Sequence, residues 1–339
     1  IRRPPRSTLS SSSAASDVYK RQVYSPNWVG DAALALPFIH KIKRKYPTAK
    51  IFVICKEWVS SIYVNNPNID KLIIIPKEKT AGIFNTLRIG LSLIREDIEI
   101  FYTLTDSFRS SIIMWLSKSK KRVGYNTQGR GIFLTDKIGI SKEKIHRSLK
   151  YLKLIREEQF NKDEKLIFID DDELIWARKE IDEIGVKSPV ALFPFSISSS
   201  RTFPGKKISE WIKDSGENYL IFGSSQDRQK ASIIANNNDI KITSICGNYS
   251  LRKSIILMSL CKYAIAADSG LGHISSIVGV PTISFFGAKR SSITGPIGDN
   301  CIIIDKSHRC KPCKKNTCCL ISISSDDVNS SIKSLSLDM

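Results

Sequence analysis

The sequence predicts an α/β protein with two domains, each built on a parallel sheet, that face each other across a central cleft. From residue 188 onward, short apolar runs of strand length alternate with segments of helical length. This alternation is typical of parallel sheets covered by helices on both faces. Residues 31–105 repeat the pattern, and a chain of 339 residues exceeds the about 100–200 residues of one ordinary domain. We therefore expect two Rossmann-like domains.

The second half contains the clearest pattern. Its expected strands cover residues 189–195, 218–224, 240–246, 263–268, 281–287 and 301–305. Its expected helices cover residues 205–214, 226–237, 250–261 and 269–279. In open sheets of this kind, ligands bind beyond the carboxyl ends of the strands. The polar stretches that follow these strands are therefore the first candidates for a functional site.

The first half repeats the pattern with expected helices at 31–46 and 80–96 and expected strands at 50–55, 71–76 and 98–105. Pro37 lies past the first turn of the first expected helix, so that helix should be kinked there or begin late. An acidic, irregular stretch at 157–173 separates the halves. We expect an N-terminal domain at 23–165, a linker region at 166–187 and a C-terminal domain at 188–339.

Residues 1–22 stand apart from this pattern. They lack the apolar segment of a signal peptide, and we identify no core element in them. They resemble the translation of a sequencing adapter, so we expect them to be non-native. The first strand is then reduced to V-Y-S-P at 23–26.

Composition and charge narrow the possible functions. A hydrophobic content of 42% and a charged content of 25% are those of a soluble globular protein. No apolar run approaches the about 18–20 residues that a spanning helix needs. The net charge of +19 suits an anionic partner, whether nucleic acid, a phosphorylated small molecule or a lipid surface.

The stretch A-A-D-S-G-L-G-H ends an expected strand and begins an expected helix. Asp268 or Ser269 can cap that helix, and the free amides of Ser269, Gly270 and Leu271 lie at its positive end. Such a helix start favours an anion, and His273 follows about one turn later. Two alternatives remain, a plain capped turn and a hydrolytic serine site, although the G-x-S-x-G elbow of many hydrolases is absent.

Three further polar clusters follow other expected strands. Asp31 begins the first helix, as a helix cap or as a catalytic residue. The loop at 193–204 contains Ser196 and Arg201 and either lines a nucleotide or is an exposed serine-rich loop. The third cluster brings arginines, which suit bidentate binding of phosphate or carboxylate, towards the first domain's face of the cleft. Its members are Ser107, Arg109, Arg122 and Arg130.

These clusters together resemble one known family. In order, from about residue 27 to 330, the chain contains N-W-V-G-D, L-T-D-S-F-R-S, K-R-V-G-Y, S-R-T-F-P, I-F-G-S-S-Q-D and A-D-S-G-L-G-H. This set resembles the ADP-heptose:lipopolysaccharide heptosyltransferases of glycosyltransferase family 9. The tryptophan in N-W-V-G-D is most similar to the heptosyltransferase II type. The resemblance implies the GT-B fold and inverting transfer of heptose from ADP-heptose to the lipopolysaccharide inner core by single displacement.

The resemblance also implies a role for each motif. Asp31 matches the general base and Arg201 the cation on the leaving diphosphate, with no metal and no cofactor required. The remaining donor-binding residues that it implies are Ser196, Gly223, Ser225, Asp268, Ser269, Gly270, Leu271 and His273. The acceptor-binding residues are Ser107, Arg109, Arg122 and Arg130.

The implied acceptor is anchored in lipid at the cytoplasmic face of the inner membrane of a Gram-negative bacterium. We expect the basic runs at 41–45 and 118–122 to hold the protein peripherally against anionic lipid. Two other function classes remain open. One is a different nucleotide-sugar enzyme of the GT-B fold, such as another sugar transferase or an epimerase. The other is a basic nucleic-acid binder, but no binding module is recognisable, so we expect no nucleic-acid partner.

Eight cysteines are not expected to form a disulfide framework, because a reducing cytoplasm is the default compartment. Cys310 and Cys313 have the C-x2-C spacing of metal sites. Adjacent Cys318 and Cys319 make a tetrahedral site awkward. A structural role, a redox-inert role and a metal site all remain open for this segment.

Overall fold

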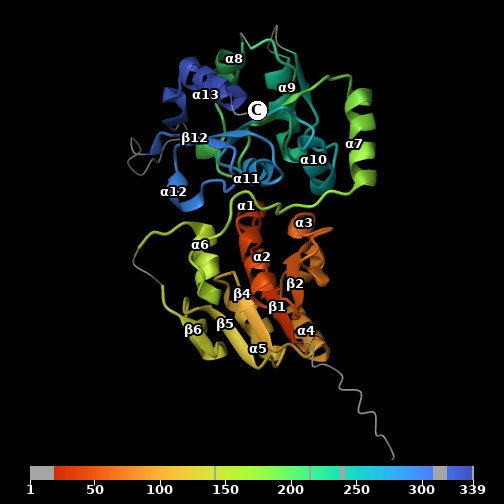
Figure 1. The fold of residues 1–339 in the computed structure, drawn as a ribbon, viewed down its shortest axis with the longest axis vertical. Helices are drawn as coiled ribbons and strands as arrows, with labels where there is room; N and C mark the ends of the chain where they lie inside the picture. Colours follow the sequence, from red (N-terminus) through yellow and green to blue (C-terminus); the bar gives the residue numbers. More distant parts are fainter. Residues whose placement is uncertain (1–18, 141–142, 214, 237–240, 308–318, 338–339) are drawn as a thin grey trace, which may run out of the picture.

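The computed structural model describes residues 19–140, 143–213, 215–236, 241–307 and 319–337. It contains two α/β domains, one above the other in Figure 1, with α1 and α11 where they meet. Each domain is built on a six-stranded sheet in which every paired strand runs parallel to its neighbour. This arrangement is the GT-B fold that the sequence predicted.

The N-terminal sheet has the strand order β3-β2-β1-β4-β5-β6. Its strands are β1 (Lys20–Tyr24), β2 (Lys50–Lys56), β3 (Lys71–Ile75), β4 (Ile100–Thr103), β5 (Lys121–Tyr125) and β6 (Asp136–Ile138). Its α-helices are α1 (Val29–Ala33), α2 (Leu36–Lys45), α3 (Glu57–Ser60), α4 (Ile83–Ser92), α5 (Phe108–Leu116) and α6 (Arg147–Leu152). Short 3-10 turns are η1 (Lys77–Lys79), η2 (Leu93–Glu96), η3 (Arg130–Phe133) and η4 (Lys153–Ile155). Helices α2 and α6 pack together on one side of the sheet, and α4 and α5 pack together on the other.

The C-terminal sheet has the strand order β12-β11-β10-β7-β8-β9. Its strands are β7 (Val190–Phe193), β8 (Tyr219–Ile221), β9 (Ile242–Ser244), β10 (Ala264–Ala267), β11 (Thr282–Phe286) and β12 (Cys301–Asp305). Its helices are α7 (Asp171–Ile184), α8 (Gly205–Ile212), α9 (Arg228–Ala235), α10 (Leu251–Met258), α11 (Gly270–Ile277), α12 (Ser291–Thr294) and α13 (Ser325–Leu337). Its 3-10 turns are η5 (Ser199–Arg201), η6 (Ser225–Asp227) and η8 (Cys319–Ser322).

Both sheets reverse their strand order at one point, between β1 and β4 and between β7 and β10. Such a reversal opens a crevice beyond the strand ends, where ligands bind in doubly wound folds. The loops after these four strands hold Asp31, the residues around Arg109, Ser196 with Arg201, and the start of α11. The topology therefore collects most of the predicted site residues at the cleft.

The secondary structure confirms every strand predicted in the C-terminal half. It also confirms the break at Pro37, because α1 ends at Ala33 and α2 begins anew at Leu36 with the proline in its first turn. Proline is tolerated there because the first amides of a helix have no intrahelical acceptor.

The expected linker region contains α7, which sequence reasoning missed. Asp170 and Glu173 form a reciprocal capping box at its start, and Gly185 ends it with a φ of 77°. The helix packs on α10, where Trp176 and Tyr249 meet edge to face with ring centroids 6.1 Å apart. The run D-D-D-E followed twelve residues later by glycine was a usable signal, because acidic caps and a terminal glycine mark helix ends.

The two domains share a buried apolar cluster that continues from α2 and β1 to α10 and α11. Arg252 on α10 adds hydrogen bonds between the two domains. Its guanidinium donates to Glu173 Oε1 at 2.7 Å, to the Phe168 carbonyl at 2.6 Å and to the Ser61 carbonyl of the N-terminal domain at 3.4 Å. These contacts hold the cleft side of one domain against the other.

The first strand differs from the sequence expectation. Residues 20–22 form the amino-terminal part of β1 at the centre of the sheet. All three pair with β2, and Arg21 and Gln22 also pair with β4. The expectation that residues 1–22 contribute no core element is therefore wrong for these three. The backbones of all three residues pair within the sheet, but the side chain of Gln22 is poorly accommodated. Gln22 is fully buried, and neither polar atom of its amide has a hydrogen-bond partner among the described residues.

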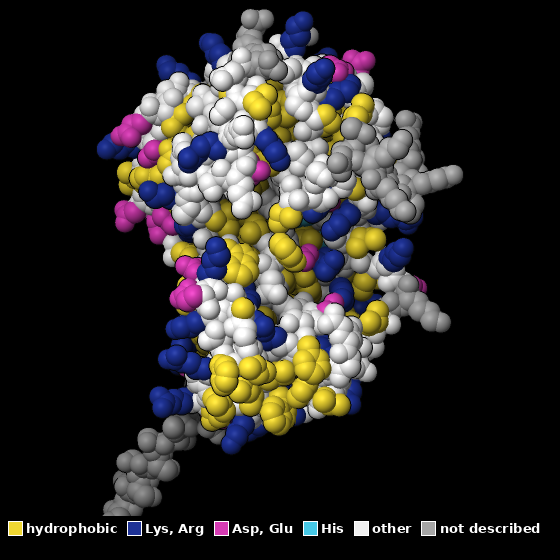
Figure 2. All heavy atoms as spheres, turned by 180° about the vertical axis from the view of Figure 1, so that it is seen from behind, with side chains coloured by type: hydrophobic (Ala, Val, Ile, Leu, Met, Phe, Trp, Pro, Cys, Tyr) yellow, Lys and Arg dark blue, Asp and Glu magenta, His cyan; other side chains and the backbone are white. Residues whose placement is uncertain are grey.

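Lys and Arg side chains are scattered over both domains on the face shown in Figure 2. Hydrophobic side chains gather at the foot of the N-terminal domain in the same view. Among the described helices, none has both the length and the apolar character needed to cross a bilayer.

We predict that Gln22→Met stabilises the protein by about 1–3 kcal/mol, because an unpaired buried amide is exchanged for an apolar side chain of similar size. The change is measured as the free energy of unfolding in urea. Gln226→Met, at an exposed position, is the matched control and should have little effect. Equal or lower stability of the Gln22 variant would contradict the burial of an unsatisfied amide.

Candidate active site at the domain interface

The amino ends of α1 and α11 meet at the interface between the domains. A Cβ atom on Gly30 would lie 2.7 Å from Cδ2 of His273, and one on Gly270 would lie 2.8 Å from Cγ1 of Val29. Real Cβ atoms do not approach other atoms so closely, so both glycines are needed for this contact. The contact brings Asp31 of the first domain beside the A-D-S-G-L-G-H segment of the second.

The start of α11 has the geometry expected of an anion-binding helix end. Ser269 is the N-cap residue, and its Oγ accepts a hydrogen bond from the Gly272 amide at 3.4 Å. The amides of Gly270 and Leu271 occupy the first turn, where no intrahelical acceptor exists. The His273 amide donates to the Ser269 carbonyl at 3.2 Å. Among the described residues, however, no hydrogen bond joins the Ser269 hydroxyl to the His273 ring, although a serine nucleophile needs such a base.

His273 is buried beside this helix start. Burial lowers the pKa of His273 to about 4, although the nearby Asp31 carboxylate acts in the opposite direction. Its Nε2 lies 3.9 Å from Oδ1 of Asp268, and its Nδ1 is buried without a partner in the described structure. At neutral pH the side chain is therefore an uncharged imidazole with an unused polar atom.

The loop after β7 is tied to the start of α11. Nη1 of Arg201 donates to the Asp268 carbonyl at 3.2 Å and lies 3.3 Å from its carboxylate Oδ2, and Ser196 Oγ donates to the same carbonyl at 3.1 Å. Burial raises the pKa of Asp268, and the charges of Arg201 and Lys289 oppose that shift. The structure thus brings together Ser196, Arg201 and Asp268 as the sequence predicted. Nε of Arg201 is buried with no partner among the described residues.

Asp31 does not cap its helix. Trp28 is the N-cap residue of α1, and Asp31 lies in the first turn with its side chain 25% exposed. Its Oδ1 is 3.9 Å from Nε of Arg147, the first residue of α6. The helix-cap interpretation therefore fails. Asp31 is a partly exposed carboxylate at the cleft side of the first domain, and Arg147 is the cation beside it.

His146, just before α6, is a further residue of the domain interface near this site, and sequence reasoning missed it. Its Nδ1 accepts from the Ser148 amide at 3.3 Å, so its Nε2 holds the proton and donates to the Gly295 carbonyl of the other domain at 3.0 Å. Burial lowers the pKa of His146, which favours this neutral form. Its position before a short helix gave no local signal.

Lys289 was also missed as a site residue. Its charge acts on both Asp268 and His273 from the loop after β11.

Two cations share a carbonyl at the first domain's side of the cleft. Nη1 of Arg109 donates to the Thr80 carbonyl, and Nζ of Lys56 donates to the same oxygen at 3.4 Å. Burial lowers the pKa of Lys56, and the neighbouring charge of Arg109 lowers it further. Ser107 is the N-cap residue of α5 just before Arg109. This pair lies beyond the carboxyl ends of β2 and β4, where Arg109 and Ser107 were predicted.

Arg130 does not reach the cleft surface. It is fully buried, and its guanidinium donates to the carbonyls of Tyr125 and Thr105 and lies 3.3 Å from Asp106. Its donors are thus used to hold the loop after β4. The prediction that Arg130 binds an acceptor directly is wrong, because it fixes the backbone on which such a site is built.

Arg122 was also assigned to the wrong place. It is the second residue of β5, at the amino end of a strand whose carboxyl end faces the cleft. Its guanidinium donates to the carbonyls of Phe133 and Ser119, each at 2.8 Å. The motif K-R-V-G-Y spans the whole strand, so its presence does not indicate which end meets the ligand.

Comparison with known proteins decides the family. Residues 86–323 match the sequence model of glycosyltransferase family 9 (heptosyltransferase). The chain belongs to this family. It is 24% identical over 306 residues to lipopolysaccharide heptosyltransferase 2 of Salmonella typhimurium, covering 83% of this chain and 86% of the relative.

Solved structures share the fold of this glycosyltransferase. E. coli ADP-heptose lps heptosyltransferase II superposes with a TM-score of 0.80 at 20% identity, covering 94% of this chain and 99% of that one. A family 9 enzyme of Veillonella parvula gives 0.82 at 20% identity, with 95% and 98% covered. Both comparisons extend over the two domains.

Gly223 and Ser225 of the glycosyltransferase follow β8, the neighbour of β7. A Cβ on Gly223 would lie 2.9 Å from Sγ of Cys246 and 3.1 Å from the Phe195 ring, so glycine is needed where the strand-end loops converge. Ser225 is exposed at the start of η6. Both residues border the site on the β8 side and do not bond to the Asp268 group in the described structure.

Within the described part of this glycosyltransferase, no three His, Cys, Asp or Glu residues are grouped to hold a metal ion. Cys55, Cys246 and Cys261 are buried thiols. Of the cysteine-rich segment, Cys310, Cys313 and Cys318 lie outside the described residues, and Cys319 is half-buried.

We predict that His273 makes stability fall as the pH decreases from about 6.5 to about 4. In this window the unfolded chain protonates the imidazole while the folded state keeps it neutral, so protons favour unfolding. Between pH 7 and pH 5 the wild type should lose about 2 kcal/mol more than His273→Gln. Urea unfolding of both proteins at the two pH values measures the difference. Parallel losses would show that His273 is not held neutral.

Proposed function

We propose that this glycosyltransferase transfers heptose from ADP-heptose to a sugar of the lipopolysaccharide inner core, with inversion at the anomeric carbon. The observation that carries the proposal is the contact between the domains, where the Asp31 carboxylate faces the start of α11 across Gly30 and Gly270. An E. coli heptosyltransferase solved with ADP-2-deoxy-2-fluoro heptose has the same fold, with a TM-score of 0.68. The similarity to heptosyltransferase 2 enzymes supports the second-heptose type.

The donor diphosphate is proposed to bind at the start of α11. The amides of Gly270 and Leu271, the unpartnered Nε of Arg201 and the charge of Lys289 all lie around this point. Backbone amides and cations stabilise the negative charge that develops on the departing diphosphate. Gly223 and Ser225 would border the adenosine.

Asp31 is the better candidate for the base than Asp106, another carboxylate on this side. Asp106 is held by Lys150 at 2.9 Å and by Arg130 at 3.3 Å. Asp31 has only Arg147 nearby, at 3.9 Å, among the described cations. The two close cations occupy the carboxylate oxygens of Asp106, whereas Asp31 keeps its oxygens available.

The proposed reaction is one displacement. The acceptor hydroxyl oxygen forms a bond to the anomeric carbon as Asp31 removes its proton, and the bond from that carbon to the ADP oxygen breaks. ADP leaves with the electron pair of the broken bond. Neutral His273 adds no positive charge, so its unpaired nitrogen serves for hydrogen bonding to the donor.

The proposal is tested with Asp31→Asn. Turnover should fall by about 10²–10⁴-fold because the base is lost, while calorimetric affinity for ADP stays close to wild type. The counterpart Arg201→Ala should weaken ADP binding by about 10–100-fold through loss of a charge-assisted hydrogen bond. Normal turnover of the Asp31 variant with ADP-heptose and acceptor would refute the assignment of the base. A melting-temperature screen of nucleotide sugars tests the donor itself and separates heptose from other sugars.

The acceptor is proposed to bind through Lys56 and Arg109, whose charges suit a phosphate or carboxylate on a core sugar. Arg109→Met should raise the acceptor KM by about tenfold or more and leave ADP affinity unchanged. Arg130→Met instead should lower the free energy of unfolding by about 3–5 kcal/mol, because buried carbonyls and Asp106 lose their partner. Acceptor kinetics and urea unfolding of both variants check this contrast. An Arg109 variant with lower stability and normal acceptor KM would contradict it.

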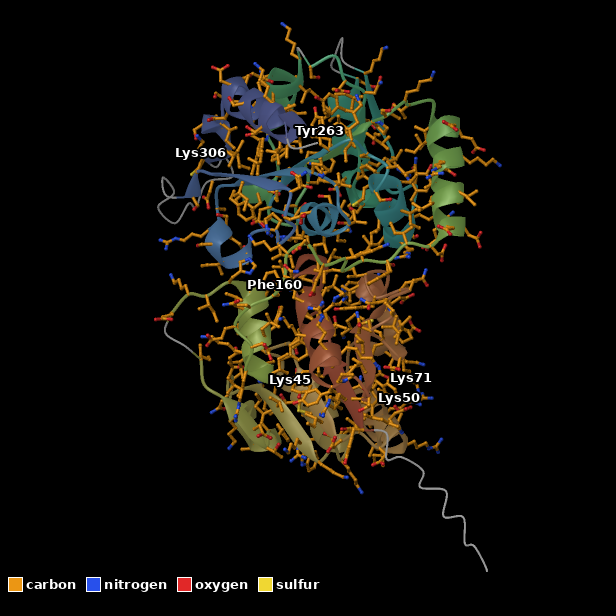
Figure 3. All side chains as sticks on the ribbon, in the orientation of Figure 1. Lys45, Lys50, Lys71, Phe160, Tyr263 and Lys306 are labelled. Carbon is orange, nitrogen blue, oxygen red and sulfur yellow. The ribbon has the colours of Figure 1, made fainter. Side chains whose placement is uncertain are left out.

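We also propose that the protein associates peripherally with the inner membrane. One of the two basic runs expected to mediate this association, however, forms ion pairs within the protein. In the run 41–45, Lys43 pairs with Asp70 at 3.2 Å and Arg44 pairs with Glu164. Lys45, labelled in Figure 3, pairs with Glu157 at 3.2 Å and donates to the Ile155 carbonyl. These charges mainly join α2 to the end of the N-terminal domain.

A further inference from the structure

Helix α4 presents its apolar side to solvent. Phe84 is 83% exposed and Leu91 is 52% exposed, whereas Thr86 and Gly90 are buried on the opposite side. A surface helix of a soluble protein normally does the reverse, with apolar residues inward and polar residues outward. Within the described part of the chain, no segment covers the outward apolar side of α4.

The fold fixes this orientation. A Cβ on Gly90 would lie 2.6 Å from Cβ of Leu116, so α4 can pack this closely against α5 because residue 90 is glycine. Thr86 supports the same packing, and its Oγ1 donates to the Gly82 carbonyl at 2.9 Å. Rotating α4 to bury its large side chains would drive them into α5. The apolar exposure thus follows from close helix packing.

An aromatic cluster on α5 and η3 extends the surface. The ring of Phe133 lies 5.3 Å from that of Phe108 and 5.8 Å from that of Trp115, which is 50% exposed. Figure 2 shows hydrophobic side chains gathered on this part of the N-terminal domain. We call this surface the α4–α5 face. Its exposed members are Ile83, Phe84, Leu87, Leu91, Ile94, Phe108, Trp115 and Ile132.

Along α5 and the segment that follows it, the border of the α4–α5 face is basic. Residues 108–122 contain five Lys or Arg and no Asp or Glu. Lys118, Lys120 and Lys121 are exposed at the end of α5, and Arg88 and Arg95 are exposed along α4 and η2. An apolar surface with a lysine and arginine border matches a bilayer whose head groups are anionic. A second copy of the same surface would bring like charges together, which disfavours a symmetric dimer.

We propose that the α4–α5 face inserts into the interfacial layer of an anionic bilayer. Its apolar side chains enter the boundary between head groups and acyl chains, and Lys118, Lys120 and Lys121 contact the head groups. Phe108 on this face immediately precedes Arg109, so docking brings the acceptor side of the cleft to the membrane surface. Only this last consequence rests on the proposed function, because lipid binding itself requires no substrate.

The first test uses Phe84→Ser with Leu91→Ser and measures flotation with vesicles of phosphatidylcholine, with and without phosphatidylglycerol. The wild type should bind the anionic vesicles, and the double variant should lose about tenfold or more of its partition coefficient. Ile175→Ser with Ile233→Ser is the matched control, since these side chains are 64% and 61% exposed on α7 and α9. The control should bind as the wild type does. Equal binding of the Phe84/Leu91 variant would overturn the proposal.

The second test locates the contact. Brominated lipids should quench the fluorescence of Trp115, and Trp115→Phe should remove most of the quenching while vesicle binding persists. Asp31→Asn should bind vesicles normally, which separates this proposal from the assignment of the base. Light scattering tests whether a second copy of the protein, instead of a membrane, covers the α4–α5 face. A wild-type dimer that becomes monomeric in the Phe84/Leu91 variant, without vesicle binding by either, would assign the face to a second copy and refute membrane insertion.

Discussion

The close approach of α1 and α11 is the constraint on which the site depends. It requires the absence of a side chain at Gly30 and Gly270, and it sets the positive ends of two helices against each other. The acidic residues Asp31 and Asp268 lie at these ends, where a negative charge is favourable. Burial keeps His273 between them neutral. The interface therefore combines a positive helix end with a carboxylate, the two features on which the proposed transfer depends.

In the N-terminal domain, some charged side chains form internal contacts that hold the fold, and others lie at the cleft. The guanidinium of Arg130 donates its hydrogen bonds inside the domain, where it holds the loop after β4. Arg109 and Lys56 share a single carbonyl at the cleft, so much of their capacity to bind an anion is unused. On the outer side, Gly90 draws α4 against α5 and leaves large apolar residues exposed. The proposed acceptor site and the proposed lipid-binding face therefore use different parts of the same domain.

The sequence by itself determined the order of strands and helices, because each element has its own period of apolar residues. It also determined which polar residues follow strand ends, and this was enough to bring Asp31, Arg201, Asp268 and His273 to one site. The break at Pro37 was equally local. The ordered motifs identified the family before any contact was known, since their spacing reflects the same succession of strand ends.

Only the tertiary structure decided which charges are available. Arg122 and Arg130 have the same chemistry as Arg109, but strand direction and burial remove them from the cleft. Conversely, His146 and Lys289 enter the site because segments distant in the chain meet there. Periodicity indicates which side of an element is apolar, but not which neighbour covers it. That information lies in contacts between domains and between helices, which depend on the packing of the whole chain.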